Sequence, residues 1–278
     1  MITPDAAPGT PSRPFLLVQT RPEDDAALAE LEALRRLGGF TEAELRVLRL
    51  DRAVDRHRAD RPADGGPAHR PARDAEGRVD WEAELADVAG VILPGSPFTG
   101  SDPEESKTAV QRGVEAELMR MLDAVADGEV PFLGCCYGVG TLGRHAGGVV
   151  DTTYRELPGA IDVTLTDDGA ADPLLAGLPS TFAAYVSHKE AVRDLPPGAV
   201  LLATGEACPV QMFRVGRHRY ATQFHPELDQ DGLIERLRIY AHHGYFPEGE
   251  AEATFAVIRS RDTPLARRIL ENFRTLFG

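Results

Sequence analysis

The sequence contains little cysteine and no long apolar run, and both shortages narrow the kinds of protein it can encode. Only three cysteines occur among 278 residues, Cys135, Cys136 and Cys208, and two of them are adjacent. An odd count in this arrangement argues against a disulfide framework and predicts a reducing, cytoplasmic location in which a thiol stays available. No stretch approaches the roughly 20 apolar residues of a membrane-spanning helix. The first residues also lack the apolar run of a signal peptide.

Basic residues are outnumbered by acidic ones, 30 against 44, which gives a formal net charge of −14. This balance speaks against a broad nucleic-acid surface, because phosphate binding depends on clustered Lys and Arg. No glycine-rich phosphate loop of the Walker type occurs. His218 and the adjacent pair His242-His243 lack the neighbouring Cys or acidic cluster of a metal site. We therefore expect no cofactor, no metal and no nucleic-acid partner.

Short apolar runs alternate with segments of helical periodicity in the first half of the chain. The predicted strands are 15–19, 45–50, 88–93 and 130–133, and the predicted helices are 23–37 and 106–126. This alternation indicates βαβ units, and hence an α/β fold with a mostly parallel central sheet covered by helices on both faces. Shorter strand-like pieces and turn signals between residues 161 and 227 predict mixed pairing there.

The chain is predicted to form a single domain over residues 14–278, preceded by a disordered arm over residues 1–13. Residues 51–76 are rich in Arg, Asp, Pro, Ala and Gly and lack apolar periodicity. They are predicted to be a loop excursion, which is either solvated or a lid over a site. A helical extension is expected from about residue 232, with a closing amphipathic helix over 264–276.

The segment Gly134-Cys135-Cys136-Tyr137-Gly138 follows an apolar strand and precedes a helix, which is the pattern of a nucleophile elbow. Glycines on both sides let neighbouring backbone approach closely. The amides at the start of the helix favour a thiolate over a thiol. Only Cys136 has a glycine two residues away on each side, so it is the predicted nucleophile. Cys135 and also Cys208 are assigned to packing.

The segment Gln223-Phe224-His225-Pro226-Glu227 supplies a base and a group to orient it. His225 and Glu227 are two residues apart, so on an extended segment they point to the same side. Pro226 biases His225 toward the extended conformation. Glu227 can then accept a hydrogen bond from one imidazole nitrogen and leave the other facing Cys136, which is the logic of a catalytic triad.

These two motifs, in 131–138 and 223–227, together with Ser187-His188, resemble the class I glutamine amidotransferases. Within that family, the Cys-Tyr-Gly and Ser-His elements are most similar to the amidotransferase domain of GMP synthase. The resemblance covers roughly residues 15–230 in motif order. It implies a flavodoxin-like α/β domain in which Cys136, His225 and Glu227 form the triad.

The resemblance also implies the groups that bind the substrate. Backbone amides of Tyr137 and of Gly95 or Ser96 would form the oxyanion hole, since the neighbouring prolines cannot donate. The backbone at Ser187 and His188 would hold the amino-acid end of glutamine or of another γ-glutamyl compound.

The sequence departs from the family at two points. Gly140 stands where the family usually has a glutamine that contacts the substrate, so the pocket is open to a γ-glutamyl compound other than glutamine. Residues 228–278 are too few for a nucleotide-activating synthetase domain, which predicts an ammonia acceptor on a separate chain. His188 with Glu190 is a weaker competitor for the role of base.

The predicted function is hydrolysis of the glutamine side-chain amide through a γ-glutamyl thioester on Cys136, with delivery of ammonia to a possible separate synthetase subunit. One alternative is a γ-glutamyl hydrolase that acts on a peptide or amine conjugate. An alternative of another class is a non-catalytic regulatory protein that keeps the fold, and it predicts no labelling of Cys136 by a glutamine-like electrophile.

Overall fold

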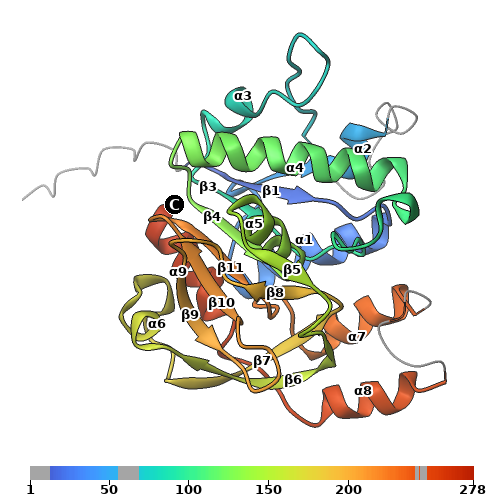
Figure 1. Ribbon diagram of the computed structural model, residues 1–278, viewed down its shortest axis with the longest axis vertical. Coiled ribbons are helices and arrows are strands. Elements are labelled where there is room, and N and C mark those ends of the chain that lie inside the picture. Colours follow the sequence, from blue (N-terminus) through green and yellow to red (C-terminus); the bar gives the residue numbers. More distant parts are fainter. Residues whose placement is uncertain (1–12, 56–68, 242–243, 245–248) are drawn as a thin grey trace, which may run out of the picture.

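The computed structural model describes residues 13–55, 69–241, 244 and 249–278. The predicted disordered arm, apart from Arg13, lies outside the described residues, as does His242-His243. A nine-stranded sheet forms the centre of the molecule (Figure 1). In spatial order its strands are β2 (Leu45–Arg49), β1 (Phe15–Gln19), β3 (Gly90–Leu93), β4 (Phe132–Cys135), β11 (Arg219–Thr222), β10 (Met212–Val215), β9 (Val200–Thr204), β6 (Glu156–Leu165) and β7 (Thr181–His188).

The sheet has a parallel half and an antiparallel half. Strands β2, β1, β3, β4 and β11 run parallel to their neighbours, and the pairings from β11 to β7 are antiparallel. A small separate sheet joins β5 (Val149–Asp151) and β8 (Ala191–Asp194). The predicted α/β fold is confirmed, with the parallel strands where the candidate site was expected and mixed pairing in the later part.

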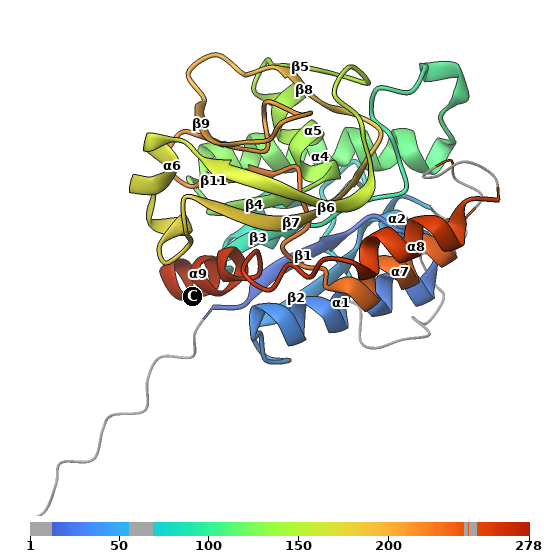
Figure 2. The ribbon, with the colours of Figure 1, turned by 90° about the horizontal axis from the view of Figure 1, so that it is seen from below.

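Helices cover both faces of the sheet, as predicted. In Figure 2, α1, α7, α8 and α9 lie on one side of the sheet, and α4 and α5 lie on the other. The α-helices are α1 (Asp24–Gly38), α2 (Leu50–Val54), α3 (Trp81–Leu85), α4 (Ala109–Asp127), α5 (Tyr137–His145), α6 (Asp167–Ala171), α7 (Gln230–Ile239), α8 (Ala251–Arg259) and α9 (Arg268–Phe277), and two short 3-10 turns are η1 (Glu104–Ser106) and η2 (Pro173–Leu175).

Strand β1 shows why the central strands read as continuous apolar runs. Phe15 and Leu17 pack into the cluster that contains α1 and α9, and Leu16 and Val18 pack into the cluster that contains α4. Successive side chains of a strand point to opposite faces, so a strand covered on both faces needs apolar residues at every position. The resulting two-sided core fixes the parallel strands whose carboxyl ends carry the candidate site.

The predicted loop excursion at 51–76 starts later than expected, because residues 51–54 belong to helix α2. Asp51 is buried and accepts hydrogen bonds from two nitrogens of Arg49, and Arg52 lies 2.6 Å from the carboxylate of Asp24. Charged residues that are paired in this way can be buried. The segment therefore folds as a helix although it lacks the apolar periodicity by which a helix is predicted from sequence. Residues 56–68 of the excursion lie outside the described part of the chain.

The last part of the chain returns to the face of α1. Helices α7 and α8 form a third apolar cluster around Tyr185 of β7, and α9 packs against α1. None of the helices in the described ranges combines the length and the apolar character that a membrane crossing requires.

Candidate active site

Cys136 occupies the turn between strand β4 and helix α5, at the carboxyl edge of the parallel strands. Its φ of 52° and ψ of −92° lie in a region that a residue with a Cβ adopts only under strain. The amide of Cys136 donates a 2.7 Å hydrogen bond to the carbonyl oxygen of Thr222 on β11, which holds the turn against the sheet. The side chain lines a small pocket and is partly exposed.

Glycine is required on both sides of this turn. A Cβ on Gly134 would lie 2.9 Å from backbone atoms of Gly138, and a Cβ on Gly138 would lie 2.9 Å from the carbonyl oxygen of Leu93. Backbone atoms of packed strands cannot give way as a flexible side chain can. The two glycines predicted for the elbow therefore allow β3, β4 and α5 to approach one another closely.

Strand β11 leads to His225, the predicted base, which lines the same pocket as Cys136. It pairs in parallel with β4, with Thr222 opposite Cys135, so the residues that follow both strands emerge side by side. The amide of His225 donates to the carbonyl oxygen of Tyr185 at 2.9 Å, and Nδ1 of His225 lies 2.7 Å from Oε1 of Glu227. His225 is 3% exposed and Glu227 is fully buried. The structure thus brings the three predicted triad residues together.

Both members of the buried pair are stabilised in their charged forms. Desolvation lowers the pKa of His225, but the interactions with Glu227 and Cys136 outweigh it and raise the pKa to about 9. Desolvation raises the pKa of Glu227, but the charge and hydrogen bond of His225 and the charge of Arg236 outweigh it and lower the pKa to about 2. At neutral pH this is an imidazolium–carboxylate pair, able to give a proton to a leaving group.

Gly95 and Ser96 line the same pocket as Cys136, in the loop that follows β3. A Cβ on Gly95 would lie 3.1 Å from Cε1 of His225 and 3.6 Å from Cβ of Cys136, so this backbone lies directly beside the thiol and the base. Tyr137 is the first residue of α5, and the amides of a first helical turn have no intrahelical acceptor. The backbone of Gly95 and Ser96 therefore lies beside Cys136, and the amide of Tyr137 directly follows Cys136 in the chain.

Ser187 and His188, whose backbone is predicted to hold the substrate, contribute to different pockets. The carbonyl oxygen of Ser187 lies 3.8 Å from Sγ of Cys136. The imidazole of His188, in contrast, bonds to the carboxylate of Glu156 at 2.9 Å and to the backbone carbonyl of Glu190 at 3.1 Å. It lines a different cavity of about 350 Å³. In this arrangement His188 does not compete with His225 for the thiol, and its carboxylate partner is Glu156 and not Glu190.

The remaining cysteines and histidines of the described chain have packing partners. Cys135 and Cys208 are buried, and desolvation raises the pKa of both thiols. Sγ of Cys208 lies with the side chains of Glu156 and His188 in a group whose potential ligand atoms are within 4.8 Å of one another. Each of the three already has a hydrogen-bond partner in the protein. The ring of His218 packs against Phe277.

Helix α7 covers the pocket that contains Cys136 and His225. The helix contributes Leu233, Arg236 and Leu237 to the lining, and Tyr240 follows directly after its last residue. The volume left free is about 20 Å³, which is room for a single water molecule. This space is smaller than an amino-acid side chain, so the inner face of α7 closely covers the thiol in this structure.

Three charged residues near the pocket, two of them buried and one largely buried, were missed by motif reasoning. Arg21 and Glu30 form an ion pair of 2.7 Å, and Arg236 lies 3.5 Å from the same carboxylate. A signal for Arg236 was present in the sequence, because it shares the i, i+3, i+4, i+7 spacing of Leu233, Leu237 and Tyr240. An arginine in such an apolar stripe indicates a buried partner.

A thiol at the end of a central parallel strand, beside a buried imidazole–carboxylate pair, defines an α/β protein with a cysteine nucleophile elbow. Comparison with known families agrees with this class. Residues 46–232 match the family described as glutamine amidotransferase class-I, and the chain belongs to that family.

Relatives with known names match about half of the chain. The GMP synthase (glutamine-hydrolyzing) of Porphyromonas gingivalis is 33% identical over 146 residues, which are 52% of this chain and 26% of that protein. A GMP synthase (glutamine-hydrolyzing) subunit of Thermococcus kodakarensis is 33% identical over 145 residues, which are 52% of this chain and 71% of that relative. The match therefore spans only a small part of the Porphyromonas protein and most of the Thermococcus one.

Solved structures share the fold at low sequence identity. A glutamine amidotransferase from Thermotoga maritima has a TM-score of 0.58 and 19% identity, and covers 93% of this chain and 99% of its own. A glutamine amidotransferase from Methylobacillus flagellatus has a TM-score of 0.62 and 15% identity, and covers 96% of each chain.

Proposed function

We propose that the protein hydrolyses the side-chain amide of glutamine through a γ-glutamyl thioester on Cys136. The sulfur of Cys136 attacks the amide carbonyl carbon, and the amides of Tyr137 and of Gly95 or Ser96 stabilise the negative oxygen. The carbon–nitrogen bond then breaks, and His225 gives its proton to the departing ammonia. His225 next removes a proton from water, which attacks the thioester and releases glutamate and the thiolate. Glu227 orients His225 throughout.

The observation that carries this proposal is the geometry of the elbow. Cys136 is held in a strained turn next to a histidine whose other nitrogen lies 2.7 Å from a buried carboxylate. A packing cysteine needs neither the strain nor the pair. We also propose that the reaction takes place in the cytoplasm and that the ammonia passes to an acceptor on a separate chain. The proposal of a separate acceptor chain is supported by relatives whose own names describe them as one subunit of a GMP synthase.

The test is a glutaminase assay of the purified chain with mass-spectrometric trapping of the acyl-enzyme. Wild type is expected to release ammonia from glutamine and to gain the mass of a γ-glutamyl group on Cys136, and Cys136→Ala is expected to do neither. Cys135→Ala is the matched control, because it removes the neighbouring thiol, which is buried away from the pocket. Full glutaminase activity in Cys136→Ala would overturn the proposal. The acyl-enzyme is detected on the chain itself, so the trapping measurement also tests the proposal when turnover of glutamine is slow.

A second candidate is hydrolysis of a γ-glutamyl peptide or amine conjugate, and Gly140 favours it. A Cβ at this position would lie 2.7 Å from Oε1 of Glu190, so the carboxylate fills the room in which the family's glutamine side chain is expected. Comparing kcat/KM for ammonia release from glutamine with that for amine release from γ-glutamyl amides separates the two. A ratio above about 10, or ~1.4 kcal/mol, in favour of one substrate class assigns the activity.

A further inference from the structure

Arg236 of helix α7 reaches the carboxylate that orients the base. Its Nη1 lies 3.2 Å from Oε1 of Glu227, which is the same oxygen that pairs with the imidazole. The same Nη1 lies 3.5 Å from Nδ1 of His225. One guanidinium nitrogen is therefore placed against both members of the imidazole–carboxylate pair.

The other side of the guanidinium is also tied to a carboxylate. Nη2 of Arg236 lies 3.5 Å from Oε2 of Glu30, and that oxygen accepts a 2.7 Å bond from Nε of Arg21. The result is a largely buried row of alternating charges that runs from the loop after β1 through α1 and α7 to the base. Its members are Arg21, Glu30, Arg236, Glu227 and His225.

The position of Arg236 needs an explanation because burial of an arginine is costly. Its side chain is 12% exposed and lies on the face of α7 that also presents Leu233 and Leu237 to the catalytic pocket. A buried guanidinium is stable only when its charge and donors are matched. Two carboxylates on opposite sides of its planar fork provide that match, and a lysine could not bridge them in the same way.

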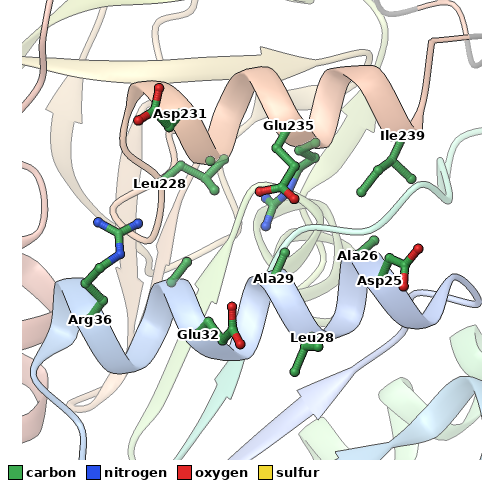
Figure 3. A pocket seen from close by; sticks show the side chains of 13 residues that line it. Asp25, Ala26, Leu28, Ala29, Glu32, Arg36, Leu228, Asp231, Glu235 and Ile239 are labelled. Atoms are coloured by element: carbon green, nitrogen blue, oxygen red, sulfur yellow. The ribbon is translucent and has the colours of Figure 1, made fainter. Parts of the chain in front are cut away.

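Arg236 also separates two spaces. A groove of about 430 Å³ runs between α1 and α7, with Glu32 and Arg36 on one helix and Asp231 and Glu235 on the other (Figure 3). Arg236 lines this groove and the catalytic pocket. None of Cys136, His225 and Glu227 lines this groove. Other residues of the groove can therefore be substituted as controls for Arg236 without changing the triad.

Resting on the proposed function, we propose that Arg236 is a positioning residue that holds Glu227 in line with His225. By occupying Oε1 together with the imidazole, the guanidinium fixes the orientation of the carboxylate. By its positive charge, it limits how strongly the carboxylate retains the imidazolium proton. His225 can then release this proton to the leaving ammonia.

The electrostatic part of the proposal depends on all ionisable groups that face the pair. From β4 and the elbow these are Cys135 and Cys136, from the loop after β1 and from α1 they are Arg21 and Glu30, and from α7 and the residue that follows it they are Arg236 and Tyr240. Among them Arg236 is the cation in direct contact with Glu227. Its removal is therefore expected to raise the pKa of His225 further, because a repelling charge next to the imidazolium is lost.

The test compares Arg236→Gln with wild type in two measurements. The first is the rate of Cys136 alkylation by iodoacetamide as a function of pH, followed by mass spectrometry of the peptide that contains Cys136. The wild-type profile is expected to inflect where the imidazolium loses its proton, at about pH 9. In Arg236→Gln the inflection is expected to move up by roughly half a pH unit or more. The second is glutamine turnover, for which kcat is expected to fall ~10- to 100-fold with a smaller change in KM.

Two further variants separate positioning from a structural role. Arg36→Gln removes an arginine from the same α1–α7 contact, where it pairs with Asp229, and it should leave both the inflection and kcat unchanged. Arg236→Lys keeps the charge but not the fork, so the inflection should return toward the wild-type pH while kcat stays reduced. If Arg236→Gln does not fold, Arg236→Lys decides, and a wild-type kcat in that variant overturns the proposal.

An unchanged inflection and an unchanged kcat in folded Arg236→Gln would likewise overturn it. Failure of the proposed function gives a different result. In that case wild type turns over no γ-glutamyl amide, but alkylation of Cys136 needs no turnover, and the shift of its pH profile still tests Arg236.

Discussion

The carboxylate of Glu190 occupies the space beside Gly140 in which a side chain at position 140 would lie, so only glycine fits there without a shift. A Cβ on Gly140 would lie 2.7 Å from Oε1 of Glu190. The same carboxylate accepts hydrogen bonds from the amides of Gly100 at 3.2 Å and Ser101 at 2.7 Å, and Arg144 lies 3.4 Å away. Glu190 therefore ties the loop after β3 to the turn between β7 and β8. The departure from the family's glutamine at position 140 has a physical cause, because glycine leaves the space that this carboxylate fills.

The first prediction concerns that pair. Gly140→Gln is expected to lower the free energy of unfolding by about 1–3 kcal/mol, because the added side chain meets a carboxylate that is held by two backbone amides. In the Glu190→Ala background the same change should cost less. Urea unfolding of the two single variants and the double variant measures the coupling, which should exceed about 0.5 kcal/mol. Additive effects would show that the two positions do not share the space.

The elbow glycines lead to the second prediction. Gly134→Ala is expected to destabilise the protein by about 1–3 kcal/mol and to reduce glutamine turnover, because its Cβ would lie 2.9 Å from backbone atoms of Gly138. Gly159→Ala is the matched control, since its Cβ would have Val257 at 3.9 Å as its nearest neighbour. Thermal unfolding and activity of both variants provide the measurement. Equal stability of the two variants would contradict the close approach of β4 and α5.

Local motifs were sufficient to predict the elbow and the pair that faces it. A strand, a glycine-flanked cysteine and a helix in immediate succession leave little choice of backbone path, and the spacing of His225 and Glu227 sets their common side. Parallel strands with their carboxyl ends at one edge then bring both motifs together. This part of the candidate site could be predicted because each motif is defined within a few residues and the fold class aligns them.

The rest depended on contacts between residues far apart in the chain. Arg236 meets Glu30 across 206 residues, and Glu190 meets Gly100 across 90. A charged side chain is usually solvated, so the sequence around Arg236 or Glu190 does not identify the distant group that it contacts. The position of α7 over the pocket could not be predicted either. The sequence of an amphipathic helix shows which face is buried but not which part of the protein that face packs against.

The strained backbone of Cys136 leads to the third prediction. At φ 52° and ψ −92° a glycine avoids the clash of a Cβ with its own backbone, whereas alanine does not. Cys136→Gly is therefore expected to be more stable than Cys136→Ala by about 1–2 kcal/mol. The usual order is the reverse, because glycine loses more conformational entropy on folding. Urea unfolding of the two inactive variants measures the difference, and a more stable alanine variant would show that the turn is relaxed.

The fourth prediction follows from the charged pair. The pKa of His225 is raised from 6.5 to about 9, so its contribution to stability is complete below pH 6.5 and is lost as the pH rises through 9. The pKa of Glu227 is lowered from 4.5 to about 2, so its contribution is complete above pH 4.5 and is lost as the pH falls through 2. The pair should therefore stabilise the fold most between pH 4.5 and 6.5.

A variant without the imidazole tests the alkaline side of this range. Between pH 6.5 and 9 the free energy of unfolding of wild type should fall relative to that of His225→Gln, by roughly 1–3 kcal/mol in total. Cys136→Ala should show a smaller fall, because the interaction with Cys136 helps to raise the pKa of His225. Urea unfolding at half-unit pH steps gives the curves. Parallel curves for wild type and His225→Gln would mean that the imidazole titrates alike in the folded and unfolded chains, and no ion pair with Glu227 could then be maintained.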